Sequence, residues 1–127
     1  GYTEVKIGFI PAIVMIFLIR KIGEQKAKHL LLSGELVGGE SAIEFGLVNK
    51  IVQSEKLAEA VVDFANKLIT NNSGQSMSLT KKMIGEVQSM KLEDALEYTA
   101  EMNAEARTSD DCKKGIRAFL NKEDLKW

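Results

Sequence analysis

The sequence predicts a mostly helical protein, and two observations carry that prediction. Apolar side chains recur at three- and four-residue spacing in several long stretches, which is typical of amphipathic helices. The clearest example is residues 55–69, with Leu57, Val61, Ala65 and Leu68 on one face. Strand-like sequence is confined to short pieces at about 2–7 and about 47–52. We therefore expect a helical unit with one short strand at each of these two places.

Length and composition fit a single globular domain. The chain has 127 residues, of which 45% are hydrophobic and 28% charged, so it can bury a core. The formal net charge of −1 gives no general attraction to nucleic acid or to an anionic membrane. Cys112 is the only cysteine, so no internal disulfide is possible. No set of residues has the spacing of a metal site.

The first long helix is expected at residues 12–22. Pro11 suits its entrance, because proline lacks the N–H donor that would be unpaired there. Gly23 is suited to its end. The helix is apolar on nearly every face, so it must be covered on most sides. It is too short to span a bilayer, and we expect another part of the protein or a partner subunit to cover it.

The remaining helices follow from periodicity and capping residues. The expected ranges are 24–32, 55–69, 79–90 and 92–107. Ser41–Glu44 reads as a capping box that opens a short helix, and Ser54 as the N-cap of the helix after it. Residues 71–74 read as a loop. Ser109 is expected to cap a last helix whose first turn carries two aspartates.

Glu4 is the residue with the most chemical interest near the start. It lies among apolar residues, where a carboxylate must be solvated, paired or used. An ordinary solvated glutamate at a strand edge is the simplest interpretation. The alternative is a catalytic carboxylate, and the residues alone do not choose between the two.

Four segments, in order along the whole chain, resemble the enoyl-CoA hydratase/isomerase (crotonase) superfamily. Gly1–Ala12 resembles its F-G-x-P-E-x-x-x-G-x-x-P segment, and Gly23–Glu35 resembles a helix that ends in L-x-[ST]-G. Ala42–Val52 is similar to A-x-x-x-G-L-V-x-x-V-V, the most specific match. Asp110–Lys122 is similar to [ST]-x-[DE]-x-x-E-G-x-x-A-F-x-E-K.

The resemblance implies the C-terminal half of a crotonase fold, the ClpP/crotonase-like β/β/α spiral. Residues 1–11 would be the last strand and turn of the spiral core. Residues 12–127 would be the helical domain through which such proteins form trimers or dimers of trimers. We therefore expect a homo-oligomer, with no nucleic-acid or membrane partner, in the cytoplasm or, in a eukaryote, in the mitochondrial matrix.

The resemblance also implies chemistry on acyl-CoA thioesters. In hydratases an oxyanion hole of two backbone N–H groups holds an enolate, and two glutamates add water to the 2,3 double bond. Glu4 matches the second glutamate, whereas the hole and the first glutamate belong to the preceding half. The backbone N–H of Ala12 would help to hold the water. Phe119 and Lys122 would hold the adenine end of coenzyme A, although Phe119 could equally be a core residue. No cofactor is implied, because the substrate carries the coenzyme A.

Three departures from the family pattern indicate a variant branch. Thr3 stands where hydratases usually have proline, residues 12–17 replace a Gly-rich run, and Asn121 replaces an acidic residue. The resemblance thus implies an enoyl-CoA hydratase fragment that is inactive by itself. Two alternatives remain open, an enoyl-CoA isomerase or other acyl-CoA enzyme of the family, and a non-catalytic helical oligomerisation module.

Overall fold

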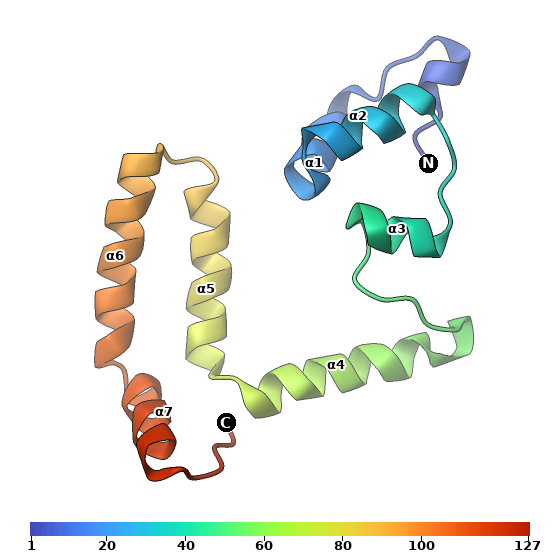
Figure 1. The fold of residues 1–127 in the computed structure, drawn as a ribbon. Coiled ribbons are helices and arrows are strands. Elements are labelled where there is room, and N and C mark those ends of the chain that lie inside the picture. Colours follow the sequence, from blue (N-terminus) through green and yellow to red (C-terminus); the bar gives the residue numbers. More distant parts are fainter. The chain divides into compact units, whose positions relative to one another are not determined.

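Helices follow one another along the whole chain in the computed structural model, which describes residues 1–127 (Figure 1). The mostly helical prediction is therefore confirmed. The chain divides into two compact units, Gly1–Leu57 and Ala58–Trp127. None of its helices combines the length and the apolar composition needed to cross a membrane. The expected division into residues 1–11 and 12–127 concerns a complete crotonase fold and stays a prediction.

The first unit is built on a pair of helices. Its elements are η1 (Glu4–Ile7), α1 (Ala12–Ile22), α2 (Glu24–Ser33), α3 (Gly39–Phe45) and η2 (Ser54–Lys56). Gly23 alone separates α1 from α2, and its φ of 80° lies where glycine is strongly favoured. The chain reverses there, so that α1 packs against α2 (Figure 1). Both predicted helices are confirmed, with α2 one residue longer than expected.

The core of this unit is small and centred on α2. Its buried members are Leu18, Ala27, Leu30 and Leu31. Partly buried side chains surround them: Tyr2, Ile22, Val37, Phe45 and Leu47. Leu18 is the only buried residue of α1, whereas Ile13 is 78% exposed and Phe17 is 65% exposed. Much of the apolar surface of α1 is thus left uncovered by this chain, as its all-round apolar composition predicts.

Neither expected strand is formed. Residues 4–7 make a turn of 3₁₀-helix, in which the N–H of Lys6 donates to the Thr3 carbonyl at 3.0 Å. Residues 47–52 form no regular element, and the N–H of Leu47 donates to the Ala42 carbonyl at 2.8 Å. A strand needs a neighbouring strand to take up its backbone groups, and the chain supplies none. The backbone therefore turns back on itself and satisfies local carbonyls.

The capping box expected at Ser41–Glu44 is wrong. The helix α3 begins at Gly39, two residues earlier, and its N-cap Gly38 has no side chain to accept a hydrogen bond. Ser41 thus lies inside the first turn. Ser54 is likewise the first residue of η2, after the N-cap Gln53. In both places the chain starts to coil before the residue whose side chain favours capping.

The second unit contains four helices. They are α4 (Leu57–Asn71), α5 (Gly74–Val87), α6 (Leu92–Thr108) and α7 (Asp110–Asn121). In sequence order α5 packs on α6 and α6 packs on α7 (Figure 1). The predictions for α6 and α7 are confirmed, including the Ser109 cap, whose Oγ accepts from the N–H of Cys112 at 3.1 Å. The prediction for α5 is wrong at its start, because that helix begins at Gly74 rather than Leu79.

A buried serine explains the early start of α5. Ser73 is only 6% exposed, and its Oγ accepts from the N–H of Ser76 at 3.0 Å, which caps the helix. The same hydroxyl donates to Oδ2 of Asp111 at 2.5 Å. One side chain therefore ties the beginning of α5 to the first turn of α7. Ser73 can be buried at little cost, because its hydroxyl has a partner both as a donor and as an acceptor.

Candidate functional site

The turn that carries Glu4 is fixed by two glycines. Gly8 ends η1 at a φ of 75°, and the N–H of Phe9 donates to the Glu4 carbonyl at 2.9 Å. On the other side η1 packs against α2. A Cβ placed on Gly34 would lie 3.0 Å from Cγ2 of Val5, tighter than ordinary contact, and Gly34 has a φ of 60°. Glycine is therefore strongly favoured at this position, where η1 approaches the end of α2.

The carboxylate of Glu4 is in an unusual state for a charged group. Glu4 is half-buried, and its Oε2 atom is buried without any hydrogen-bond partner in the chain. Oε2 is the only buried side-chain oxygen or nitrogen in the chain with no partner. A buried acceptor without a partner costs about 1–3 kcal/mol, and more when it is charged. The simple prediction of a solvated glutamate at a strand edge is therefore wrong, since there is neither a strand nor full solvation.

Ala12 is the first residue of α1, so its N–H has no hydrogen-bond partner within the helix. That N–H donates to the Ile10 carbonyl at 2.9 Å in this structure. Ala12 is itself exposed. To hold a water molecule, this N–H would have to break its hydrogen bond to the Ile10 carbonyl or donate to both acceptors at once.

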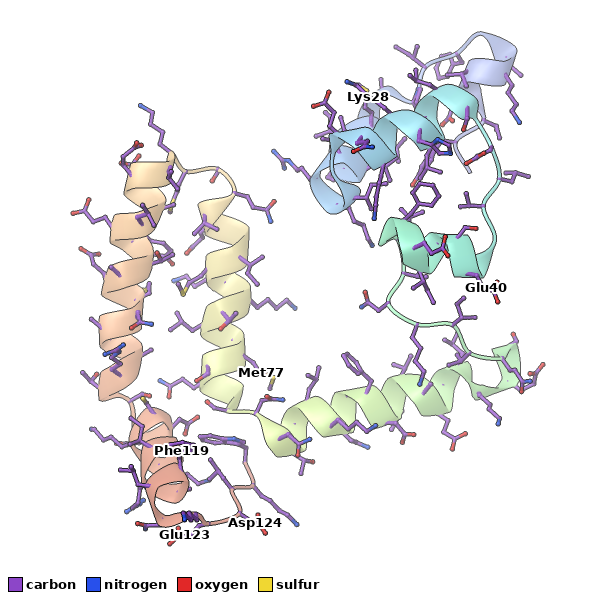
Figure 2. The ribbon with its side chains drawn as sticks, in the orientation of Figure 1. Lys28, Glu40, Met77, Phe119, Glu123 and Asp124 are labelled. Atoms are coloured by element: carbon purple, nitrogen blue, oxygen red, sulfur yellow. The ribbon has the colours of Figure 1, made fainter.

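Phe119 and Lys122 lie at the C-terminal end of α7. Figure 2 shows Phe119 on this helix and Glu123 and Asp124 in the segment that follows it. Phe119 is 82% exposed, so it does not belong to the core of this chain. Lys122 is also exposed, and its φ of 56° makes it the only residue other than glycine with a positive φ. The N–H of Lys122 donates to the Phe119 carbonyl at 3.2 Å, which joins the two residues in one turn.

The predicted site residues thus form two pairs, one in each unit. Glu4 and Ala12 stand on either side of the turn that leads into α1. Phe119 and Lys122 stand on either side of the end of α7. The structure brings Phe119 and Lys122 together through the hydrogen bond between their backbones, whereas no hydrogen bond joins Glu4 to Ala12.

The side chains with shifted pKa values, Glu24 and Tyr98, lie outside these pairs. A hydrogen bond with Lys28 lowers the pKa of Glu24 on α2, where the two side chains are 2.5 Å apart. The hydroxyl of Tyr98 donates to Glu86, which raises the pKa of Tyr98 because ionisation would break the bond. No group of three or more His, Cys, Asp or Glu side chains could hold a metal ion.

Sequence reasoning did not single out Trp127 and its neighbours. This residue borders an open hollow of about 590 Å³, which the start of α5 also lines. Lys114 on α7 places its Nζ 4.8 Å from the centre of the Trp127 ring. The one available signal was a lone tryptophan beside a lysine in a charged tail, with a glycine at position 115 in the helix before it.

Comparison with known proteins places these features in a family. The family model for enoyl-CoA hydratase/isomerase matches residues 1–127. A "Putative enoyl-CoA hydratase" of Thermus thermophilus is 43% identical over 122 residues, covering 96% of this chain and 48% of the relative. A "Trans-2-decenoyl-[acyl-carrier-protein] isomerase" of Streptococcus mutans is 28% identical, covering 97% of this chain and 47% of the relative. Relatives of this family therefore carry the names of different reactions.

Solved structures of the same family also resemble this chain. The crystal structure of an enoyl-CoA hydratase from Geobacillus kaustophilus matches with a TM-score of 0.80 at 30% identity, over 98% of this chain and 47% of that one. The chain thus spans about half the length of the curated relatives that it matches, as a C-terminal half would. The chain belongs to the enoyl-CoA hydratase/isomerase family.

Proposed function

We propose that this chain is the C-terminal half of an enoyl-CoA hydratase, which adds water to the 2,3 double bond of an acyl-CoA thioester. The observation that carries the proposal is the state of Glu4. Its Oε2 is buried without a hydrogen-bond partner, and the resemblance to hydratases implies a catalytic carboxylate at this position. Buried polar groups almost always have a hydrogen-bond partner, so an exception calls for an explanation, and a catalytic role is one.

In the proposed reaction Glu4 handles protons. Syn addition requires one group to orient and deprotonate the water and to supply the proton that the α-carbon receives. Glu4 would share these roles with a second carboxylate from the other half of the protein. The N–H of Ala12 would help to hold the water. The enolate would be stabilised by backbone donors outside this chain, because preorganised donors usually supply the largest single contribution.

The other pair would bind coenzyme A rather than the reacting carbons. Phe119 exposes an aromatic ring on which adenine can stack, and Lys122 offers an ammonium group to phosphate. The substrate brings the coenzyme A, so the proposal requires no further cofactor and no metal.

Two alternatives have support of their own. The Streptococcus mutans relative is named as an isomerase, which favours double-bond migration as a second candidate reaction. That reaction would also use a carboxylate to move a proton. A non-catalytic oligomerisation module is favoured by the exposed apolar residues of α1, but it gives no reason to bury an unpartnered carboxylate oxygen.

The 127-residue chain by itself is expected to show no hydratase activity. It carries one candidate carboxylate, and the proposal places the oxyanion donors elsewhere. The purified chain is mixed with crotonyl-CoA, and the loss of enoyl-thioester absorbance is followed. Turnover above the rate in buffer would contradict the assignment of essential groups to the other half.

We also propose that the complete protein is a homo-oligomer, a trimer or a dimer of trimers. The support is apolar side chains that this chain leaves in solvent, such as Ile13, Phe17 and Leu120, each more than half exposed. The chain is therefore expected to self-associate. Sedimentation velocity at tens of micromolar gives the mass, and a clean monomer would argue against the proposal.

Lys122→Ala in the full-length enzyme is expected to raise KM for crotonyl-CoA about tenfold and to leave kcat nearly unchanged. The reason is that a charge-assisted bond to phosphate is worth about 1.5 kcal/mol or more and is equally present in ground and transition states. Lys67→Ala, which removes an exposed lysine from α4, is the matched control. Equal KM values for the two variants would remove Lys122 from the binding site.

A further inference from the structure

The segment after α7 is anchored at its far end. The N–H of Trp127 donates to the Thr70 carbonyl, near the end of α4, at 3.1 Å. Lys114 donates from Nζ to the Lys126 carbonyl at 3.1 Å and places the same Nζ 4.8 Å from the centre of the Trp127 ring. The tail therefore returns from the end of α7 (Figure 1) and makes contacts with α4 and with α7.

The tail packs over Gly115 of α7. A Cβ on Gly115 would lie 3.7 Å from both Cζ2 and Cη2 of the Trp127 ring and 3.8 Å from Cδ2 of Leu125. The ring thus packs on the face of α7 where no side chain intervenes. Trp127 and Leu125 are partly buried, although most of the residues around them are exposed. The tail therefore lies on the helix instead of extending into solvent.

Lys122 lies between the two anchored parts. Its left-handed backbone is unfavourable relative to a right-handed one for a residue with a Cβ. Such a conformation persists where the surroundings determine it. On one side the N–H of Glu123 donates to the Ala118 carbonyl at 2.9 Å. On the other side the Trp127 anchor fixes where the tail must go.

We propose that Lys114 and Trp127 act as a clamp that positions Lys122 for binding the phosphate end of coenzyme A. This inference rests on the proposed function of Lys122. Both clamp residues are positioning residues, because they act through the turn and need not touch the ligand. A fixed backbone lowers the ordering cost that binding would otherwise carry. Loosening the clamp should therefore weaken binding of the nucleotide end and leave the chemistry intact.

The test uses the full-length enzyme and two substrates, crotonyl-CoA and crotonyl-pantetheine, which lacks the nucleotide. Lys114→Met removes the cation over the ring, an interaction whose strength corresponds to about a two- to fivefold effect. We expect KM for crotonyl-CoA to rise by that factor, with kcat and the KM for crotonyl-pantetheine unchanged. Lys114→Arg should restore the KM, because a guanidinium also stacks on an aromatic ring. Lys113→Met removes the neighbouring exposed lysine and is the matched control.

A double variant separates positioning from direct contact. If Lys114 acts through Lys122, then Lys114→Met should change nothing further in a Lys122→Ala background. Multiplied effects would mean that Lys114 meets the ligand itself and would overturn the clamp. A raised KM in Lys122→Ala with none in Lys114→Met would overturn the clamp and leave the proposed function standing. If Lys122→Ala itself has no effect, both fall, because the clamp would have nothing to position.

Discussion

Replacing Leu30 with alanine is expected to lower the free energy of unfolding of the first unit by about 2–5 kcal/mol. Leu30 is 1% exposed and is the largest fully buried side chain of the chain. Its loss removes apolar burial and leaves a cavity between α1 and α2, where Leu18, Ala27 and Leu31 are the other buried residues. Because the core has so few buried residues, the loss of one is a large part of the stability of the unit.

Leu32→Ala is the matched control for this prediction. Leu32 belongs to the same helix but is 74% exposed, so the same deletion of atoms removes little burial. Urea unfolding followed by circular dichroism at 222 nm, a wavelength typical of helix, measures both variants. Equal losses of stability in Leu30→Ala and Leu32→Ala would mean that the packing of α2 against α1 does not hold this unit together.

Helices whose ends are encoded locally could be predicted from the sequence. The boundary between α6 and α7 is an example, because Ser109 and the two aspartates after it specify a cap within a few residues. The all-round apolar character of residues 12–22 likewise predicted that α1 would remain partly uncovered. In each case the decisive interaction lies within one turn of the residues that encode it.

The errors fall where a distant residue decides the structure. The start of α5 at Gly74 depends on Ser73, whose hydroxyl is held by Asp111 from another helix. A loop-like Asn-Asn-Ser-Gly sequence gives no sign of that partner. The two expected strands failed for a related reason, since extended sequence becomes a strand only beside another strand. The chain offers residues 2–7 and 47–52 no such neighbour.

In the candidate site, too, some features could be predicted from the sequence and others depend on contacts between distant residues. Resemblance to a family picked out Glu4, but the buried, unpartnered state of its Oε2 follows from how η1 coils against α2. The close approach of η1 to the end of α2 also involves Gly34, where a Cβ would lie 3.0 Å from Cγ2 of Val5. The contacts of Trp127 with Thr70 and Lys114 join residues far apart in the sequence, and no periodic pattern encodes them.

The carboxylate of Glu4 combines a structural cost with a proposed chemical benefit. Burying an acceptor without a partner destabilises the folded chain, and a charged acceptor costs more than a neutral one. An amide in the same place keeps the shape and removes the charge. Glu4→Gln should therefore leave stability unchanged or raise it slightly, a pattern expected where stability is given up for activity.

In the full-length enzyme, Glu4→Gln is expected to lower kcat for hydration of crotonyl-CoA by about 10²–10⁴-fold, which is typical of one positioned acid or base. KM should change little, because glutamine keeps the shape of the site and substrate binding is assigned to other residues. Steady-state kinetics with crotonyl-CoA measure both constants, and thermal unfolding of the same preparation shows whether the fold is intact.

Glu24→Gln provides the matched control, since it makes the same chemical change on an exposed carboxylate of α2 that pairs with Lys28. Its kcat should equal that of the parent, because a surface ion pair contributes little. If Glu4→Gln hydrated crotonyl-CoA within a few-fold of the parent, Glu4 would be a bystander, and the proposed hydratase mechanism would lose its only acid/base group in this chain. The same variant can be assayed for double-bond isomerisation of a 3-enoyl-CoA. If both activities fell in parallel, Glu4 would still be the proton carrier, because both reactions move a proton at the α-carbon.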